Sequence, residues 1–223
     1  MPAQPDQPIV ALVAFDGSAE AAAAIRAASR LLAGARVVVM YASGEPAAAG
    51  NAALARIAVP DSIIAGSVAT YEREAEQAAE RLAEHGRELA EALGLEAMVC
   101  VDSRLSPWRA ICHAAVENEA DVIVCGTRGR GGIARAFLGS ILKSLVHHSP
   151  RPVLVVPPGG NHLSGPLLIA YDGSDGARSA IRTAARLLPT RSALIVTACR
   201  SDDVAASGLG HNADVPTLIV RGP

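Results

Sequence analysis

The sequence predicts an α/β protein: an open, parallel five-stranded sheet with helices on both faces, followed by a degenerate second copy of the same unit. Three observations support this fold class. Short apolar runs alternate along the chain with segments of helical periodicity. Each apolar run is nearly continuous, as is typical of strands buried on both faces. The beginning of the chain also recurs near its end. Because successive strand–helix–strand units cross over in a right-handed sense, the strands should lie parallel.

The composition is that of a globular protein with a substantial core. The 223 residues are 50% hydrophobic and 19% charged, and the formal net charge is −2. A nucleic-acid-binding domain normally carries a basic excess, and the two Phe, three Tyr and one Trp are too few for a base-stacking platform. We therefore expect no nucleic-acid partner.

Membrane and secretory classes are also disfavoured. No apolar run reaches the roughly 18 residues that a membrane helix needs. The first residues, MPAQPDQP, lack the positive charge and apolar stretch of a signal peptide. The four cysteines stand singly, without a Cys-x-x-Cys spacing, so we expect reduced thiols and a cytoplasmic protein.

The first part of the chain contains the complete set of elements. Strands are predicted at 9–15, 37–42, 95–101, 121–125 and 152–156, and helices at 18–32, 68–93, 107–118 and 140–148. Ser18 can cap the first helix, and Gly34 and Gly94 stop the first two helices. Pro107 suits the first turn of the third helix. Residues 43–66, rich in Gly, Pro and Ala, are predicted to be mainly a loop, with a helical turn at 52–57 as an alternative, and the Gly- and Arg-rich residues 126–139 are predicted to be a loop.

The internal repeat divides the chain into two parts. Residues 12–32 match residues 168–188 at 13 of 21 positions, including the Asp-Gly-Ser turn. We predict a complete domain over residues 8–158 and a truncated second copy over 165–223. The intervening Pro- and Gly-rich segment 157–162 reads as a linker.

The second copy keeps its beginning and its end but lacks its middle. Its last strand, 217–220, resembles the strand that closes the first copy. Losing two central strands would leave this last strand without a neighbour, and unpaired backbone groups are costly. We therefore expect it to pair beside residues 167–171 or to join the sheet of another copy. In either case the truncated copy should serve as a packing or dimerisation element.

A Gly- and Arg-rich segment between a buried strand and a helix, from Gly126 to Ser140, is the strongest candidate site. Glycines allow the backbone to approach a phosphate closely, and the first N–H groups of the helix attract anions. Arg128 adds positive charge nearby. A plain surface loop has the same composition, but this loop follows the carboxyl end of a strand, where open α/β sheets bind ligands. It is not a P-loop, because no Gly-Lys-Ser/Thr follows the glycines.

The spacing Gly126-x2-Gly129-x9-Gly139-Ser140 resembles the ATP-binding signature of the universal stress protein family. The opening IVALVAFDGS and the segment DVIVCGTRGRGG resemble that family as well, and the resemblance covers residues 8–158. It implies the strand order 3-2-1-4-5, adenine-nucleotide binding in one subgroup, dimerisation and a role in the stress response. Tandem copies are common in this family.

The resemblance also assigns residues to the site. By this resemblance, Asp16 would lie beside the ribose and phosphates, and the backbone of Ala42 would contact adenine. The residues of the glycine signature, Gly126 to Ser140, would surround the phosphates. Met40-Tyr41-Ala42 replaces the usual Leu-His-Val at the adenine contact, and the second copy retains Asp172 but no Gly-rich loop, so we expect one nucleotide site per chain. The predicted nucleotide-binding residues are Asp16, Ala42, Gly126, Arg128, Gly129, Gly139, Ser140 and Ile141.

The predicted function is a stress-response binding and signalling module for ATP or another adenine nucleotide, with or without Mg²⁺. One alternative is a slow ATP hydrolase or nucleotidyl-transfer enzyme that uses the same cleft. The other is a partner-binding protein without nucleotide affinity. No catalytic set is evident, since adjacent His147 and His148 do not form a metal motif and His113 with Glu117 reads as a helix-surface pair. We expect a homodimer or an internal pseudo-dimer.

Overall fold

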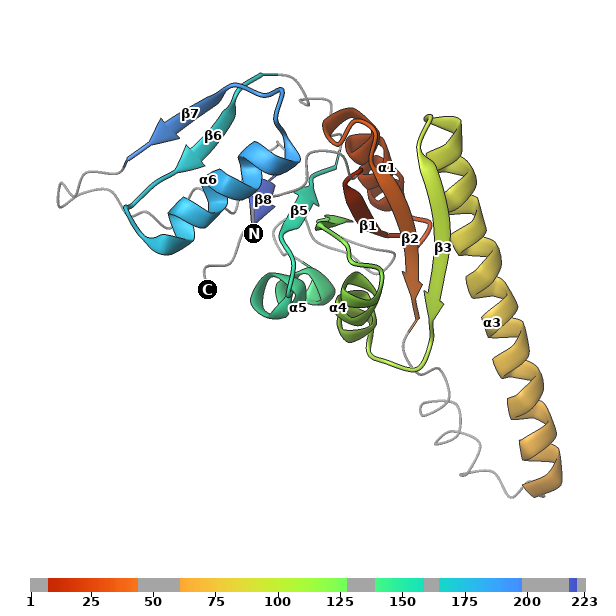
Figure 1. Ribbon diagram of the computed structural model, residues 1–223. Helices are drawn as coiled ribbons and strands as arrows, with labels where there is room; N and C mark the ends of the chain where they lie inside the picture. The colour runs from red at the N-terminus through yellow and green to blue at the C-terminus, as the bar shows by residue number, and fades with distance from the viewer. Residues whose placement is uncertain (1–7, 44–60, 128–138, 159–164, 198–216, 220–223) are drawn as a thin grey trace.

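The computed structural model describes residues 8–43, 61–127, 139–158, 165–197 and 217–219. Strands and helices alternate along it, as the sequence predicts (Figure 1). The strands are β1 Val10–Ala14, β2 Arg36–Ala42, β3 Glu96–Asp102, β4 Val122–Gly126, β5 Val153–Val156, β6 Leu167–Ala170, β7 Ala193–Val196 and β8 Thr217–Ile219. The helices are α1 Ala19–Leu31, α3 Asp61–Ala92, α4 Pro107–Glu117, α5 Ser140–His148 and α6 Asp175–Leu187.

The main sheet has the strand order β3-β2-β1-β4-β5-β8. Its first five strands are parallel, which confirms the predicted order 3-2-1-4-5. The sixth strand was not part of that expectation. β8 comes from the far end of the chain and pairs with β5 in the antiparallel direction. Of the two predicted places for this strand, the one beside residues 167–171 is therefore wrong, because β6 pairs with β7 instead.

Helices cover both faces of the parallel sheet and divide the core into two clusters. Alternate strand residues such as Ala11 and Val13 pack with α1 and α3. The strand residues on the opposite face, such as Leu12 of β1 and Val38 of β2, pack with α4 and α5. The middle residues of the central strands β1 and β4 are buried, which is why these strands are continuous apolar runs. Among the described helices, none is long and apolar enough to cross a membrane.

The Asp-Gly-Ser turn after β1 starts α1 as the sequence predicts. The Ser18 backbone N–H donates to Asp16 Oδ1 at 3.0 Å, and Ser18 Oγ accepts from the Ala21 N–H at 3.1 Å. Gly17 lies between them at φ +79°, where a side chain would be strained. The turn thereby fixes Asp16 at the carboxyl end of β1 and the start of α1 beside it.

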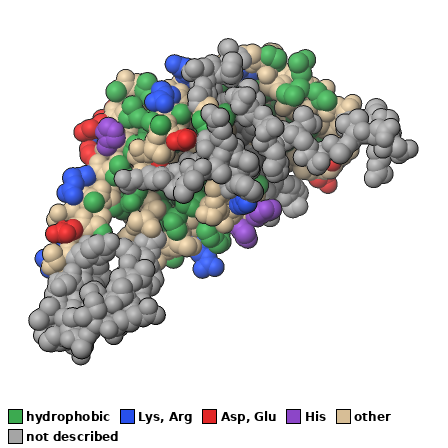
Figure 2. Space-filling model, turned by 180° about the vertical axis from the view of Figure 1, so that it is seen from behind, with side chains coloured by type: hydrophobic (Ala, Val, Ile, Leu, Met, Phe, Trp, Pro, Cys, Tyr) green, Lys and Arg blue, Asp and Glu red, His purple; other side chains and the backbone are tan. Residues whose placement is uncertain are grey.

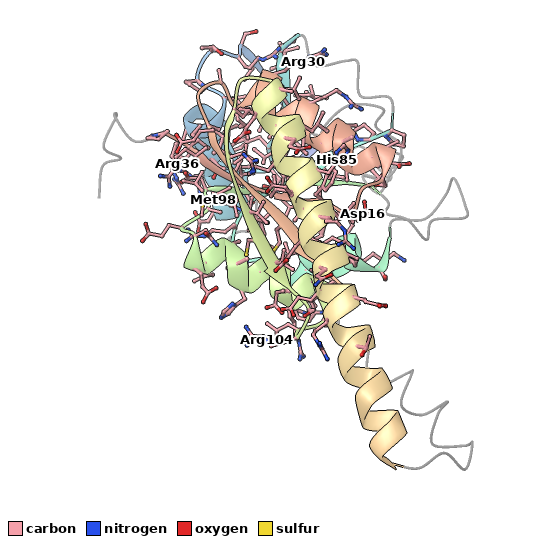
Figure 3. The ribbon with its side chains drawn as sticks, turned by 90° about the vertical axis from the view of Figure 1, so that its right-hand side faces the viewer. Asp16, Arg30, Arg36, His85, Met98 and Arg104 are labelled. Atoms are coloured by element: carbon pink, nitrogen blue, oxygen red, sulfur yellow. The ribbon has the colours of Figure 1, made fainter. Side chains whose placement is uncertain are left out.

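Helix α3 begins earlier than predicted. It starts at Asp61, within the segment 43–66 that the sequence analysis assigned mainly to a loop. A single glycine, Gly66, is the only breaker in residues 61–67, and an isolated glycine is tolerated in a helix. The acidic Asp61 also suits the first turn of a helix. The N-terminal part of α3 extends beyond the sheet (Figures 1 and 3).

The segment after residue 165 has the local geometry of the beginning of the chain. Ser174 caps α6 by accepting from the Ala177 N–H at 3.1 Å, and its own N–H donates to Asp172 Oδ1 at 2.9 Å. Strands β6 and β7 pair in parallel as β1 and β2 do, but they form a separate two-stranded sheet. Hydrophobic side chains gather on the surface over these two strands (Figure 2, upper right).

One glycine in α3 has a packing role that a substitution can test. A Cβ added at Gly86 would lie 2.7 Å from Val39 Cγ1 and 2.8 Å from Phe15 Cδ1, and both side chains are buried. Alanine is favoured over glycine in a helix by about 1 kcal/mol, but overpacking a core costs about 1–3 kcal/mol. We expect Gly86→Ala to lower the free energy of unfolding in urea, whereas the exposed neighbour Glu88→Ala should change it little. A more stable Gly86→Ala variant would contradict this packing.

Candidate functional site

The candidate site lies where the strand order of the parallel sheet reverses. β1 and β4 are neighbours, but the chain leaves β1 toward β2 on one side and leaves β4 toward β5 on the other. Ligands of open α/β sheets bind outside the carboxyl ends of strands at such a point. Asp16 follows β1 there, and Thr127 follows β4. Asp16 precedes α1 and Arg30 lies near the other end of this helix. The two residues are well apart in Figure 3.

Gly126 brings the end of β4 close to the first turn of α1. A Cβ at this position would lie 2.9 Å from Glu20 Cβ and 3.2 Å from the Glu20 carbonyl carbon. Only glycine allows this approach without a shift of the helix. The predicted site residue Gly126 therefore has a structural reason of its own, which is to hold α1 against the carboxyl end of β4.

Thr127 is a site residue that the sequence analysis missed. Its backbone N–H donates to the Val156 carbonyl at 3.2 Å, and its carbonyl accepts from the Gly139 N–H at 3.2 Å. Its Oγ1 is buried and has no hydrogen-bond partner among the described residues. A buried hydroxyl without a partner costs free energy and calls for an explanation. A threonine that directly follows the apolar run VIVCG was the signal in the sequence.

The start of α5 meets this strand end. Gly139 is the N-cap residue of α5, and the cap makes no side-chain hydrogen bond. The Gly139 carbonyl accepts from the Lys143 N–H at 3.0 Å, so the helix is formed from its first turn. Ser140 is exposed, and Ile141 is 41% exposed. The first N–H groups of a helix have no partner within the helix, and an N-terminus of this kind can bind an anion.

The remaining predicted residues are placed unequally. Ala42 ends β2, the neighbour of β1, and pairs with Asp102 of β3. Asp16, Ala42, Gly126, Gly139 and Ser140 thus share the carboxyl-terminal edge of the sheet with the start of α5. Arg128 and Gly129 lie outside the described residues.

The histidines have structural contacts. His113 Nδ1 lies 3.3 Å from Glu117 Oε2 on the surface of α4, which confirms the predicted helix-surface pair. The His148 ring lies 4.9 Å from the Trp108 ring between their centroids. Within the described ranges, no group of three or more His, Cys, Asp or Glu side chains is placed to hold a metal ion.

Cys125 lies one residue before Gly126 but is an unsuitable nucleophile. The side chain is buried in β4, and burial raises the pKa of its thiol to about 12. Burial also raises the pKa of the Cys112 thiol. Since the thiolate is the reactive form, Cys125 stays protonated and unreactive at neutral pH.

Comparison with known proteins identifies the family. The sequence model of the universal stress protein family matches residues 10–157. A universal stress protein from Thermus aquaticus is 36% identical over 151 residues, which is 65% of this chain and 96% of that protein. Universal stress protein Rv2005c of Mycobacterium tuberculosis is 40% identical over 65 residues, but these span only 26% of this chain and 21% of the relative.

Solved structures share the fold at low sequence identity. A universal stress protein from Archaeoglobus fulgidus aligns with a TM-score of 0.62 at 20% identity, over 88% of this chain and 70% of that protein. The hypothetical protein MJ0577 aligns with a TM-score of 0.55 at 18% identity, over 69% of this chain and 99% of that protein. The family match over most of the first 158 residues and the shared fold lead to one conclusion. This chain belongs to the universal stress protein family.

Proposed function

We propose that this chain binds an adenine nucleotide, ATP with or without Mg²⁺, at the carboxyl ends of β1, β2 and β4. The observation that carries the proposal is the buried hydroxyl of Thr127 beside the start of α5, which has no hydrogen-bond partner among the described residues. A hydroxyl in that position can donate to an anionic oxygen, and the N–H groups in the first turn of α5 can donate to the same group. A nucleotide phosphate would supply the missing acceptor.

The other residues of the edge fit the remaining parts of such a ligand. Asp16 follows β1 with its carboxylate at the switch point, where it would accept hydrogen bonds from ribose hydroxyls. The backbone at Ala42 lies one strand further along the same edge, which suits contact with a base. The triphosphate supplies the negative charge that the α5 N-terminus favours.

Binding, rather than turnover, is the function that the described residues support best. Hydrolysis would require a set of groups positioned for acid–base chemistry, and no sequence motif places a histidine or a second carboxylate to complete such a set with Asp16. A slow hydrolase remains the second reading, and a partner-binding protein without nucleotide affinity the third. The cytoplasmic location and the role in a stress response are further parts of this proposal.

Replacing Thr127 with valine separates nucleotide binding from folding. Valine keeps the shape of threonine and removes a hydroxyl that has no partner among the described residues. We therefore expect the free energy of unfolding to stay equal or rise. The Kd for ATP, measured by isothermal titration calorimetry, should rise about ten- to a hundredfold, because a hydrogen bond to a charged group contributes about 1.5–3 kcal/mol.

Unchanged ATP affinity in Thr127→Val would remove the observation on which the proposal rests. Absence of measurable ATP binding in the wild-type chain would favour the partner-binding reading instead. Steady release of phosphate from the wild-type complex, lost in Thr127→Val, would favour the hydrolase.

The internal repeat offers a matched pair for testing one site per chain. Asp16 and Asp172 each accept the N–H of the serine two residues later, at 3.0 and 2.9 Å, so alanine removes the same turn contact at both places. We expect Asp16→Ala to weaken ATP binding about tenfold or more and Asp172→Ala to leave the Kd unchanged, with one ATP per chain in both. Equal losses of affinity would contradict a single site at Asp16, because Asp172 would then contribute to ATP binding as much as Asp16 does.

A further inference from the structure

The second segment repeats the beginning of the first unit in structure as well as in sequence. Val13 of β1 pairs with Val39 of β2, and their counterparts in the repeat, Ile169 of β6 and Ile195 of β7, pair in the same way. Helix α6 follows β6 as α1 follows β1. The two units can therefore be compared position by position, including the elements that cover each strand.

In the first unit, helix α3 covers β2 and the turn before α1. Val39 is completely buried, and a Cβ added at Gly86 of α3 would lie 2.7 Å from Val39 Cγ1. A Cβ added at Gly17 would lie 2.7 Å from Leu82 Cδ1 of the same helix. Helices α1 and α3 are also in contact with each other. Leu82 and Gly86 thus mark the face of α3 that packs on this surface.

The equivalent surface of the second segment is open. Ile195, the counterpart of Val39, is 56% exposed. No described atom lies within 4 Å of a Cβ added at Gly173, the counterpart of Gly17. Among the described residues of this segment there is no counterpart of α3, and β7 lies at the outer side of the molecule (Figure 1). We call the area formed by Gly173, Ile195 and the adjacent side of α6 the β7 surface.

The charges on α6 and α3 indicate what kind of element fits the β7 surface. Helix α6 carries three arginines and one aspartate, and Arg182 is exposed in the middle of this helix. Where α1 has Ala22, which packs against the core, α6 has Arg178. Helix α3, which covers the equivalent surface of the first unit, contains eight acidic and three basic residues. The β7 surface therefore combines an apolar strand with a basic helix, which favours an amphipathic helix with acidic residues as its partner.

We propose that the β7 surface is a docking site for an acidic amphipathic helix of another protein. The helix lies across β7 beside α6, as α3 lies across β2 beside α1, with its apolar face on Ile195 and its acidic side chains toward the arginines of α6. Helix α3 of a second copy is not available for this contact, because Ala83 and Ala90 on its apolar face are buried against its own sheet. This inference is independent of nucleotide binding.

A synthetic peptide with the sequence of residues 73–93 is a probe of this chemistry, because it contains the part of α3 that packs on β2. Its binding to the full chain is measured by the fluorescence anisotropy of a label on the peptide. We expect saturable binding of one peptide per chain. Ile195→Asp should raise the Kd at least about tenfold, since it removes apolar contact and adds a charge of the same sign as the peptide.

The neighbouring residue of the same strand provides a matched control. Leu194 is 57% exposed, as much as Ile195, but successive residues of a strand point to opposite faces. Leu194→Asp should therefore leave the Kd for the peptide unchanged. Arg182→Glu tests the charge: it should weaken binding at low ionic strength, and the difference should shrink as salt is added. A peptide carrying Leu82→Asp should not bind, because its apolar face is interrupted.

Absence of saturable binding to the wild-type chain would overturn the proposal. Equal affinities of Ile195→Asp and Leu194→Asp would also overturn it, because the peptide would then bind a place that both variants share, such as the first unit. A change of oligomeric state in Ile195→Asp without peptide, measured by light scattering, would show that a second copy occupies the surface and would overturn the choice of partner. Circular dichroism verifies folding, and if Ile195→Asp is unfolded, Arg182→Glu decides the outcome.

Discussion

The fold depends on covering both faces of one parallel sheet. Leu12 of β1 is completely buried because α4 and α5 cover its face, and Val38 of β2 is 2% exposed for the same reason. The corresponding residues of the second segment, Leu168 and Leu194, are 66% and 57% exposed. The described residues of that segment include no counterpart of α4 or α5. The same apolar pattern is therefore core in one unit and surface in the other, and covering helices decide which.

Much of the first unit could be predicted because its signals are local. The Asp-Gly-Ser turn, the cap at Ser18 and the continuous apolar strands each act within a few residues, and these elements are found close to their predicted positions. The start of α3 was not predicted, because the isolated Gly66 and the neighbouring Pro- and Gly-rich stretch indicated a loop, whereas these residues form the first turns of the helix. The position of β8 was predicted only as one of two alternatives, and the structure bears out the one in which the strand joins the sheet of another copy, here beside β5.

The candidate site shows the same limit of local reasoning. Glycine spacing and the family resemblance predicted which residues form a ligand site, and the structure places five of these residues along one edge of the sheet. Thr127 belongs to no such motif, and only its position directly after the apolar run VIVCG marks it in the sequence. Its importance follows from burial and from the absence of a partner for its hydroxyl among the described residues, which only the three-dimensional structure reveals. Gly126 illustrates the converse, because the close approach of Glu20 already requires a residue without a Cβ at this position.

The candidate site and the pairing with β8 both depend on strand β5. Thr127 donates its backbone N–H to Val156 at the end of β5 and accepts from Gly139 at the start of α5. Helix α5 is followed by β5 along the chain, so the strand that pairs with β8 both follows this helix and accepts the backbone N–H of Thr127. Val153 and Val155 pack with α5 in one core cluster, while Leu154 packs with α6 in the other. The position of β5 therefore affects both the candidate site, through Thr127, and the pairing with β8.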